Sequence, residues 1–439
     1  EADPVLEGCR VDGNRALEYD GAGLFMVNSS PTLRRCEIVG NRSELDDYSV
    51  QVRQGGGIFI HHSSPTLEDC TIAENLVTSG AYASADDGYA YGAGVSMLYS
   101  SPIFRRCRLI HNRLESFATG YSYAFGGGVY MYDSSPEFEG CRFEQNVAYA
   151  HWSLPRAFGG GLAAHDSAPV LRNCVVTQNR VEGMGNPEAH GGGLYLYESE
   201  GIFTNLYIAE NMADGSSNTS YQQGSSAGGG LLCIASELEL SNVIISHNIA
   251  RGHSSRGGGM YSWDSVSQIR NCTIVMNEVI GPYAAEGGGV YFTDGTALMG
   301  SNIIAFNTED NLAQGYDAVS QTLTYTDLYN PPGQPNHDLP SLDSSNLTVE
   351  PGFLKYLEGF PVDLHLAIDS PLVNAGEPAT LDRDSSRSDM GCYGGPGGAT
   401  WDLDQDGWPD WFWPGTLANA PEGFDPADFD ADDSKPDLH

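Results

Sequence analysis

One spacing recurs along most of this chain and constrains its fold more than any other feature. In GGGIFIHHSSPTLEDCTIAEN (residues 55–75), with the first glycine as position zero, apolar residues stand at positions three, twelve and seventeen and an Asn at position twenty. Nine units share this pattern, and they begin at Gly21, Gly55, Gly92, Gly126, Gly159, Gly191, Gly228, Gly257 and Gly287. Their twentieth positions are Asn41, Asn75, Asn112, Asn146, Asn179, Asn211, Asn248, Asn277 and Asn307. Such a constant register predicts a solenoid, whose stacked units present equivalent side chains at equivalent places.

The units read as short strands joined by a turn of small residues. After the glycines, Val129 and Met131 alternate with Tyr130 and Tyr132, which is the period of a half-buried strand. Because parallel strands stack about 4.8 Å apart, the apolar residues at position seventeen should superpose: Ile38, Ile72, Leu109, Phe143, Val176, Ile208, Ile245, Ile274 and Ile304. We expect the constant Asn to form an internal ladder in which each amide bonds its neighbours and the turn backbone.

These repeats resemble the right-handed parallel β-helix of the pectate-lyase-like superfamily. They also resemble the short repeats of bacterial polymorphic outer-membrane proteins, which usually read GGA-I and FxxN. Here seven of the nine units read GGG followed by Ile, Val, Leu or Met, and one example of the second motif is FEQN at residues 143–146. The resemblance covers residues 1 to about 310 and implies an all-β, right-handed parallel β-helix of about ten rungs.

The cysteines follow the same register. Seven of the nine stand at position fifteen of a unit: Cys9, Cys36, Cys70, Cys107, Cys141, Cys174 and Cys272. Leu206 and Val243 occupy that position in two other units, so we interpret these cysteines as small buried hydrophobes. In-register neighbours rarely have disulfide geometry, which makes a disulfide or metal role the weaker interpretation.

The charge of the chain restricts its partners. There are 58 Asp and Glu against 21 Lys and Arg, a net charge of -37. Such a protein should repel nucleic acids and anionic membranes at long range. It should also repel polyuronates unless cations bridge the two. The sequence contains no run of about 18 apolar residues, so it predicts no membrane-spanning helix. The resemblance to bacterial β-helix proteins implies an extracellular or cell-surface protein, with the periplasm as the alternative.

Inserts of variable length separate the units. The step from each Asn to the next glycine ranges from 9 to 17 residues, and several inserts are rich in Tyr, Ser, Ala and Gly (78–92, 115–126 and 148–159). Rigid aromatic residues among small polar ones are typical of binding loops, and stacked loops are where solenoids usually bind partners. The alternative is that these loops pack on each other and that their rings cover the flank of the solenoid.

The outward positions of the glycine strand predict an aromatic stripe. Positions four and six carry the candidate binding residues Tyr130, Tyr132, Tyr195, Tyr197, Tyr261, Trp263 and Tyr291. Acidic residues border the stripe at position seven. Our first hypothesis is a non-catalytic protein that binds a glycan or a surface protein through this flank.

The second hypothesis is a glycoside hydrolase. Asp133, Asp166 and Glu198 stand at position seven of three successive units, which places them about 5 and 10 Å apart by strand spacing. These separations approach those of retaining and inverting carboxylate pairs. Two observations favour a simpler interpretation. Asp before a Ser-rich turn commonly bonds the backbone, and no Lys or Arg stands at positions four, six or seven, which argues against a lyase.

After Asn307 the register ends. Residues 311–350 are polar, and the segments DLHLAIDSPLVNAG (363–376) and SDMGCYGG (388–395) resemble the C-terminal region of secreted bacterial β-helix proteins of the choice-of-anchor Q type. That resemblance implies a cap on the last rung and a secreted or surface protein. We therefore divide the chain into a β-helix (1–310), a C-terminal cap region (311–398) and an acidic tail (399–439).

The tail contains a candidate calcium loop. Asp402, Asp404, Asp406, Gly407 and Asp410 spell DxDxDGxxD, which offers oxygen ligands around a sharp turn. Trp413 stands where an EF-hand has its bidentate Glu, so the loop is closer to those of thrombospondin type 3 repeats and dockerins. A second set of candidate ligands is Asp425, Asp428, Asp430, Asp432 and Asp433. The alternative interpretation is a disordered acidic linker.

The first rung is incomplete. Leu6, Cys9, Val11 and Asn14 match positions twelve, fifteen, seventeen and twenty, but no glycine strand precedes them. Since an uncapped β edge invites pairing, we expect either a removed upstream segment or a partner that covers this end.

Overall fold

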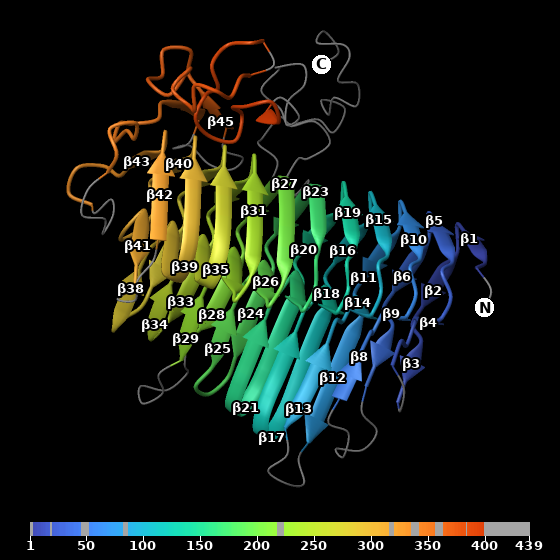
Figure 1. Cartoon of the computed structure of the whole chain (residues 1–439). Helices are drawn as coiled ribbons and strands as arrows, with labels where there is room; N and C mark the ends of the chain where they lie inside the picture. The colour runs from blue at the N-terminus through green and yellow to red at the C-terminus, as the bar shows by residue number, and fades with distance from the viewer. Residues whose placement is uncertain are drawn as a thin grey trace, which may run out of the picture.

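The protein is a parallel β-solenoid with an arm along one side (Figure 1). A 28-stranded sheet forms the body and a 15-stranded sheet forms the arm. The described residues contain no α-helix, and accordingly no helix among them is long and apolar enough to cross a bilayer. The structure, a computed structural model, describes residues 3–17, 20–44, 52–81, 87–216, 224–315, 320–334, 342–355, 363–382 and 384–398.

Three parallel ladders build the body. The first, formed by the strands after the glycines, comprises β4 (Leu24–Val27), β9 (Ile58–His61), β14 (Val95–Leu98), β18 (Val129–Tyr132), β22 (Leu162–His165), β26 (Leu194–Tyr197), β30 (Leu231–Ile234), β35 (Met260–Arg270), β39 (Val290–Gly300) and β41 (Leu312–Gln314). The second comprises β1 (Val5–Glu7), β5 (Thr32–Arg34), β10 (Thr66–Glu68), β15 (Ile103–Arg105), β19 (Glu137–Glu139), β23 (Val170–Thr177), β27 (Glu200–Ala209), β31 (Glu237–Ser241), the ends of β35 and β39, and β42 (Ser320–Thr324). The third comprises β2 (Arg10–Asp12), β6 (Glu37–Val39), β11 (Thr71–Ala73), β16 (Arg108–Ile110), β20 (Arg142–Glu144), the ends of β23 and β27, β32 (Ile244–Ser246), β36 (Thr273–Val275), β40 (Ile303–Ala305) and β43 (Asp327–Tyr329).

The constant Asn forms the predicted ladder inside the solenoid. Asn112 donates from Nδ2 to Asn146 Oδ1 at 3.0 Å, and Asn146 donates in the same way to Asn179 at 2.9 Å. The same Oδ1 of Asn146 accepts the backbone N–H of Asn112 at 3.1 Å. All three side chains are fully buried. The superposition predicted from equal spacing is therefore confirmed.

The core beside this ladder is stacked by residue type. Phe104 and Phe138 stack at 4.7 Å between ring centroids, and position seventeen is buried in every full turn. All nine cysteines are free thiols, eight of them buried. Burial raises the pKa of the Cys272 thiol to about 12. The prediction that cysteines act as small hydrophobes is confirmed.

The inserts, which we expected to be loops, are largely strands that build the arm. The chain leaves the body in an outgoing layer: β3 (Arg15–Ala16), β7 (Arg42–Ser43), β12 (Leu76–Ala81), the first part of β17 (Arg113–Phe125) and of β21 (Val147–Phe158), β24 (Arg180–Gly183), β28 (Met212–Gly215), β33 (Ile249–Gly252) and β37 (Glu278–Ile280). It comes back in a return layer: β8 (Val52–Gln54), β13 (Gly88–Tyr91), the second part of β17 and β21, β25 (Glu188–His190), β29 (Ser225–Ala227), β34 (Ser254–Arg256) and β38 (Ala284–Glu286). Both layers pair in parallel from turn to turn.

Small residues hold the two layers of the arm together. One cluster between them contains Ala90, Ala124, Ala148 and Ala157, all buried. Large side chains alternate with these alanines and point outward, as Tyr89 and Tyr91 do on either side of Ala90. Both outer faces carry ion pairs, such as Arg180–Asp214 at 3.0 Å on the outgoing face and Arg156–Glu188 at 3.1 Å on the return face. The return face also carries a stack of Tyr89, Tyr91, Tyr123 and Phe125 rings.

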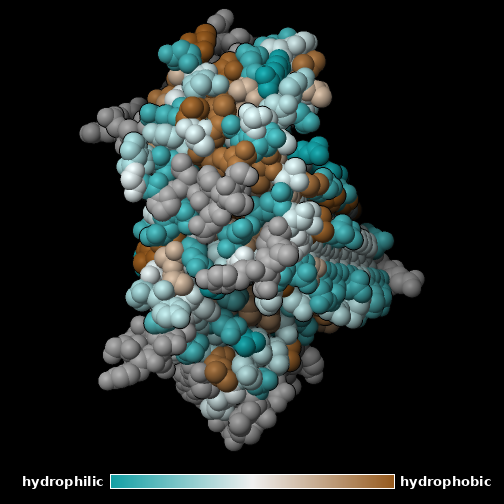
Figure 2. Space-filling model, turned by 60° about the vertical axis from the view of Figure 1, so that its left-hand side comes forward, coloured by the Kyte–Doolittle hydropathy of each residue, from teal (hydrophilic) through white to brown (hydrophobic). Residues whose placement is uncertain are grey.

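The C-terminal segment contacts the last turn and one side of the body. Leu347 pairs with Asp327 in a parallel bridge, so the chain around it continues the stack past β43. Later residues run back along the third ladder, where Asn242 donates to the Cys392 carbonyl at 2.8 Å. An apolar cluster joins the two parts: Val175, Tyr207, Ile244 and Ile303 of the body with Phe353, Leu364, Leu372 and Met390, including residues of the hairpin β44 (Phe353–Lys355) and β45 (Asp363–Leu366). Hydrophobic surface gathers near this junction in the view of Figure 2.

Asp327, under this C-terminal segment, should make stability depend on pH. Its Oδ1 accepts the Val349 N–H at 2.9 Å, while its Oδ2 has no partner among the described residues. Burial raises the pKa of Asp327 to about 7. Between the unfolded-chain pKa of about 3.9 and this value, the folded protein keeps a proton that the unfolded chain releases. Stability should therefore fall as pH rises through this window, by up to about 1.4 kcal/mol per pH unit.

Asp327→Asn tests this expectation, since the amide still accepts the Val349 N–H but cannot ionise. Thermal melts from pH 4 to 8 should show a flatter profile and a higher Tm at pH 8 than in the wild type. The exposed Asp369→Asn serves as the control and should leave the profile unchanged. Parallel profiles for wild type and Asp327→Asn would contradict the assignment.

Candidate functional site

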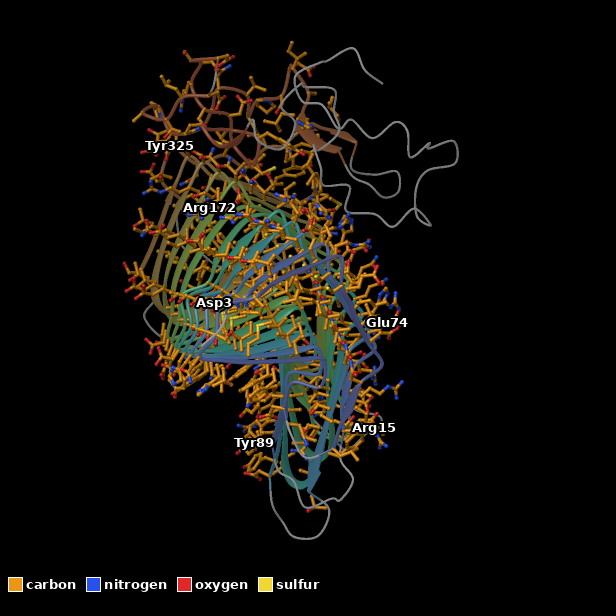
Figure 3. The ribbon with its side chains drawn as sticks, turned by 90° about the vertical axis from the view of Figure 1, so that its right-hand side faces the viewer. Asp3, Arg15, Glu74, Tyr89, Arg172 and Tyr325 are labelled. Atoms are coloured by element: carbon orange, nitrogen blue, oxygen red, sulfur yellow. The ribbon has the colours of Figure 1, made fainter. Side chains whose placement is uncertain are left out.

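The candidate site is the angle at which the arm meets the first ladder of the body. Viewed along the solenoid, the arm projects from the body and carries Tyr89 on one face and Arg15 on the other (Figure 3). The face with Tyr89 is the return layer, which we call the wall. The outward residues of the glycine strands, at positions four and six, are the floor. Wall and floor together are called the aromatic corner.

Ring contacts close the inner angle of the aromatic corner. Tyr91 of the wall lies 4.5 Å from Tyr130 of the floor between ring centroids, and Phe158 lies 4.9 Å from Tyr195. These contacts bury Tyr130 and Tyr195, and the Arg256 guanidinium of the wall lies 5.4 Å from the Tyr291 ring centre. Tyr130, Tyr195 and Tyr291, three of the predicted binding residues, are only 6%, 4% and 6% exposed. The sequence placed these residues on an open stripe. The structure places them under the arm, whose strands were expected from the sequence to be loops.

The open part of the floor is at position six. Tyr132, Tyr197 and, at position four, Tyr261 are half-buried, and Trp263 is 45% exposed. The Trp263 indole donates to Asp294 Oδ2 at 3.3 Å. Four of the seven predicted binding aromatics are therefore accessible from the corner.

His165 lies at the centre of the floor and was not among the predicted site residues. Its ring packs between aromatic rings, with centroid distances of 5.1 Å to Phe125 and 5.2 Å to Tyr197. Burial lowers its pKa to about 4, so the imidazole is neutral near pH 7. Its Nε2 has no hydrogen-bond partner among the described residues. The signal that could have found it is its place at position six between Tyr132 and Tyr197.

Acidic residues form a rim along the outer edge of the floor. Register brings Asp133, Asp166 and Glu198 onto consecutive turns, as predicted. All three are exposed and have positive φ angles of 45°, 48° and 49°. Asp tolerates this left-handed conformation better than most residues. A structural role in the turn therefore accounts for much of this column without any catalysis.

The end of the floor towards the N-terminus carries more rings and no acids. Phe25 and Tyr99 are 59% and 45% exposed, and Phe25 stacks on Phe59 with 5.2 Å between centroids. His61 and His62 lie between Phe59 and Tyr99, with His62 stacked on Tyr99 at 5.1 Å. The corner therefore changes along its length from aromatic and histidine side chains to aromatic and acidic ones.

The wall carries a stack that ends in an ion pair. Tyr89 and Tyr123 stack with centroids 4.8 Å apart and planes 5° apart. On the next turn the Arg156 guanidinium lies 5.9 Å from the Tyr123 ring centre and donates to Glu188 Oε1 at 3.1 Å. Arg256 repeats this pairing, because it donates to Glu286 at 2.8 Å. Each of these wall arginines is thus neutralised by a neighbouring carboxylate.

The predicted calcium ligands lie outside the described residues. This applies to Asp402, Asp404, Asp406, Asp410, Asp428, Asp430 and Asp432. Within the described part of the chain, no group of three or more His, Cys, Asp or Glu side chains is placed to hold a metal ion.

Comparison with known proteins identifies the fold. The family model described as "Right handed beta helix region" matches residues 5–321. Among solved structures, the pectate lyase Pel9A is 12% identical, with a TM-score of 0.32 over 83% of this chain and 87% of its own. The periplasmic alginate epimerase AlgG is 11% identical, with a TM-score of 0.27 over 73% and 76%. Both likenesses are too distant to bear on activity, and no curated protein matches the sequence.

Proposed function

The chain belongs to the family of proteins with a right-handed β-helix region, and on this premise we propose that it binds a neutral polysaccharide along the aromatic corner. Aromatic side chains pair a large apolar surface with precise orientation, which suits the apolar faces of sugar rings. Successive turns repeat such groups about every 4.8 Å. An extended polysaccharide, whose sugars repeat at a similar interval, can therefore meet equivalent groups along the corner.

The exposed ring of Trp263 carries this proposal. Its neighbours at position six are Ile234 on one turn and Thr293 on the other. The Trp263 side chain is 45% exposed beside the smaller Thr293, and the bond to Asp294 orients its indole. An open, oriented Trp beside a carboxylate offers both stacking and a hydrogen-bond acceptor to a sugar.

Charge favours an uncharged polysaccharide. The rim acids Asp133, Asp166, Glu198, Asp264 and Asp294 border the floor, and the wall arginines are already paired. A polyuronate would bring its carboxylates against this rim, and like charges at close range are unfavourable. The net charge of -37 adds repulsion at longer range.

Binding without turnover agrees best with the turn conformation of the rim acids. The glycoside hydrolase is retained as second candidate because the register places Asp133, Asp166 and Glu198 on consecutive turns. The proposal also includes secretion or display at the cell surface, calcium binding by residues 402–410, a capping role for residues 311–398 and a partner at the first rung. These four parts are supported by the sequence motifs alone.

Trp263→Ala should weaken polysaccharide binding by about tenfold or more, since loss of one buried apolar side chain costs about 1.5–3 kcal/mol. Affinity electrophoresis in gels that contain β-glucan, xylan, mannan or polygalacturonate measures this effect. Wild type should be retarded by at least one neutral gel and not by polygalacturonate. Tyr283→Ala removes an 80% exposed ring at the tip of the arm and should leave the retardation unchanged.

The same panel separates the two candidate functions. If wild type binds no neutral polysaccharide, or if Trp263→Ala binds as well as wild type, the proposal is wrong. Release of reducing ends that stops in Asp166→Asn would replace it with the hydrolase. Retardation that survives Asp166→Asn, without release of reducing ends, supports binding alone.

A further inference from the structure

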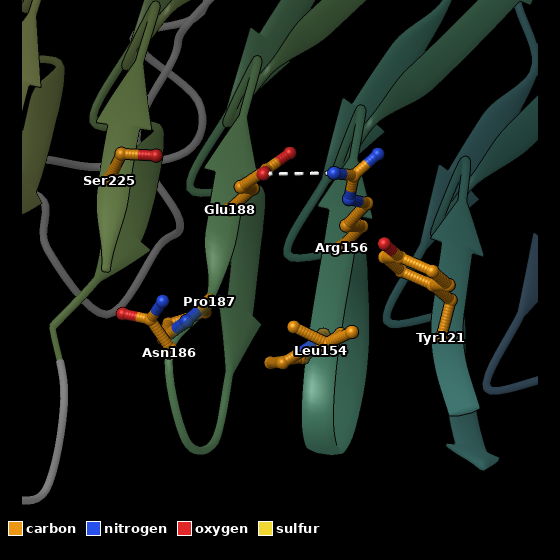
Figure 4. A pocket seen from close by; sticks show the side chains of 8 residues that line it. Tyr121, Leu154, Arg156, Asn186, Pro187, Glu188 and Ser225 are labelled. Atoms are coloured by element: carbon orange, nitrogen blue, oxygen red, sulfur yellow. Dashed lines mark hydrogen bonds and ion pairs between the residues drawn. The ribbon is translucent and has the colours of Figure 1, made fainter. Parts of the chain in front are cut away.

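A cavity of about 130 Å³ opens in the wall of the arm (Figure 4). It lies across four neighbouring turns, on strands β17, β21, β25 and β29 and the turn that leads into β25. Its lining consists of Tyr121, Leu154, Pro155, Arg156, Asn186, Pro187, Glu188 and Ser225. Tyr121 stands four residues before Phe125 on β17, and Arg156 stands two residues before Phe158 on β21, so each pair lies on one face of its strand. Phe125 and Phe158 contact the floor. The cavity therefore faces the same side as the aromatic corner.

The size of the cavity matches one six-membered ring. A cavity of about 150 Å³ in another protein holds benzene. A pyranose has a ring of the same size and adds hydroxyl groups, which can reach out through the mouth. A second sugar would not fit.

The lining of the cavity combines apolar side chains with hydrogen-bond donors and acceptors. Leu154 and the two prolines supply apolar contacts, and Tyr121, Asn186 and Ser225 supply hydroxyl and amide groups. The Arg156 guanidinium lies over the Tyr121 ring at 5.1 Å and donates to Glu188 at 3.1 Å. A guanidinium has five N–H donors and a carboxylate has several acceptor sites, so this pair keeps capacity for further bonds. Paired donors and acceptors are what adjacent sugar hydroxyls require.

The ion pair also excludes charged ligands. Glu188 cancels the charge of Arg156 at 3.1 Å, so an anion would gain little from the arginine and would be repelled by the carboxylate. A cation would find the carboxylate already paired. An uncharged polar ring remains as the ligand that fits both the volume and the charge.

We propose that this cavity is a subsite for a single uncharged pyranose, carried as a branch or terminal sugar of the polysaccharide. This assignment rests on the proposed function, because the cavity opens beside the surface along which the polymer would lie. The branch sugar would add specificity to a corner whose aromatic stacking is otherwise tolerant of the sugar's identity.

Saturation-transfer NMR on the full chain tests the subsite with methyl glycosides of glucose, galactose, mannose and xylose, and with methyl glucuronide. At least one neutral glycoside should receive saturation, and methyl glucuronide should not. Ser225→Phe fills the cavity and should abolish the transfer. The matched control is Ser254→Phe, which adds the same ring at the equivalent position of the next turn, outside the cavity. Should Ser225→Phe fail to fold, Asn186→Ala, an exposed residue, should lower the transfer at least threefold.

Glu188→Gln provides a readout that a purely structural role would not produce. It uncovers the charge of Arg156, so methyl glucuronide should now receive saturation. The subsite is refuted if no neutral glycoside responds, if the response survives Ser225→Phe, or if methyl glucuronide binds the wild type as well as the neutral sugars do. Trp263→Ala should keep the glycoside signal while it loses the polymer, so failure of the subsite and failure of the proposed function give different patterns.

Discussion

Replacement of Asn146 by alanine should lower the free energy of unfolding by about 2–6 kcal/mol, because a buried polar group left without a partner costs about 1–3 kcal/mol. The Asn146 Oδ1 is the acceptor for the backbone N–H and the side-chain amide of Asn112. Its Nδ2 donates to the Leu109 carbonyl at 2.8 Å and to Asn179 Oδ1 at 2.9 Å. Alanine removes all four bonds in a place that water cannot reach, since the side chain is fully buried.

Asn14→Ala is the matched control for this prediction. Asn14 occupies the same position in the ladder and donates to Asn41 Oδ1 at 2.8 Å, but it is exposed to solvent. Water can replace its bonds, so the loss should stay below about 1 kcal/mol. Urea unfolding followed by circular dichroism compares the two variants. Equal losses would mean that the ladder contributes through something other than the satisfaction of buried groups.

The body could be predicted from the sequence because all its positions can be counted from the first glycine of each unit. Every residue between a glycine and the following Asn keeps its distance from that glycine, so inward, outward and amide columns can be read directly, as with Ile72 and Leu109. Stacked parallel strands then convert equal spacing into superposition. For this reason the Asn ladder, the buried cysteines and the order of the rim acids were all foreseen.

The arm could not be predicted from the same origin. The step from Asn to the next glycine varies, so residues of different inserts fall out of register when they are counted forward. Counted backward from the following glycine, Ala90, Ala124 and Ala157 all stand two positions before it, each between large side chains. This alternation of small and large residues was the available signal for strands, and the aromatic composition was read as a loop instead.

The same omission explains the errors at the candidate site. Without the arm, Tyr130 and Tyr195 had no partner and were expected to face solvent. Contact with Tyr91 and Phe158 buries them and leaves position six as the open part of the floor. The acids at position seven were correctly ordered, but the positive φ of Asp166 could not be read from its residue type.

Gly127→Ala is the second change expected to have a large effect, with a loss at or above the upper end of the roughly 1–3 kcal/mol typical of an overpacked core. A Cβ on Gly127 would lie 2.5 Å from the Gly160 carbonyl oxygen and 2.6 Å from the Val147 carbonyl carbon. Neither backbone group can move alone, because the Gly160 carbonyl accepts the Gly128 N–H at 3.0 Å and Val147 is the first residue of β21. Gly127 lies where the return layer enters the body and passes the start of the outgoing layer. We call this junction of the two layers with the body the neck of the arm, and the triple glycine lies there.

Gly300→Ala separates this steric cause from the general effect of removing a glycine. Gly300 also lies in a strand of the body, but its Cβ would be 3.7 Å from the nearest atom, the Thr324 hydroxyl oxygen. Alanine there should be neutral or stabilise by about 0.4–1 kcal/mol, because it reduces the freedom of the unfolded chain. Urea unfolding of both variants measures the difference. If Gly127→Ala were as stable as Gly300→Ala, the two layers of the arm could separate at the neck without cost, and the close backbone crossing could not be the reason for the repeated glycines.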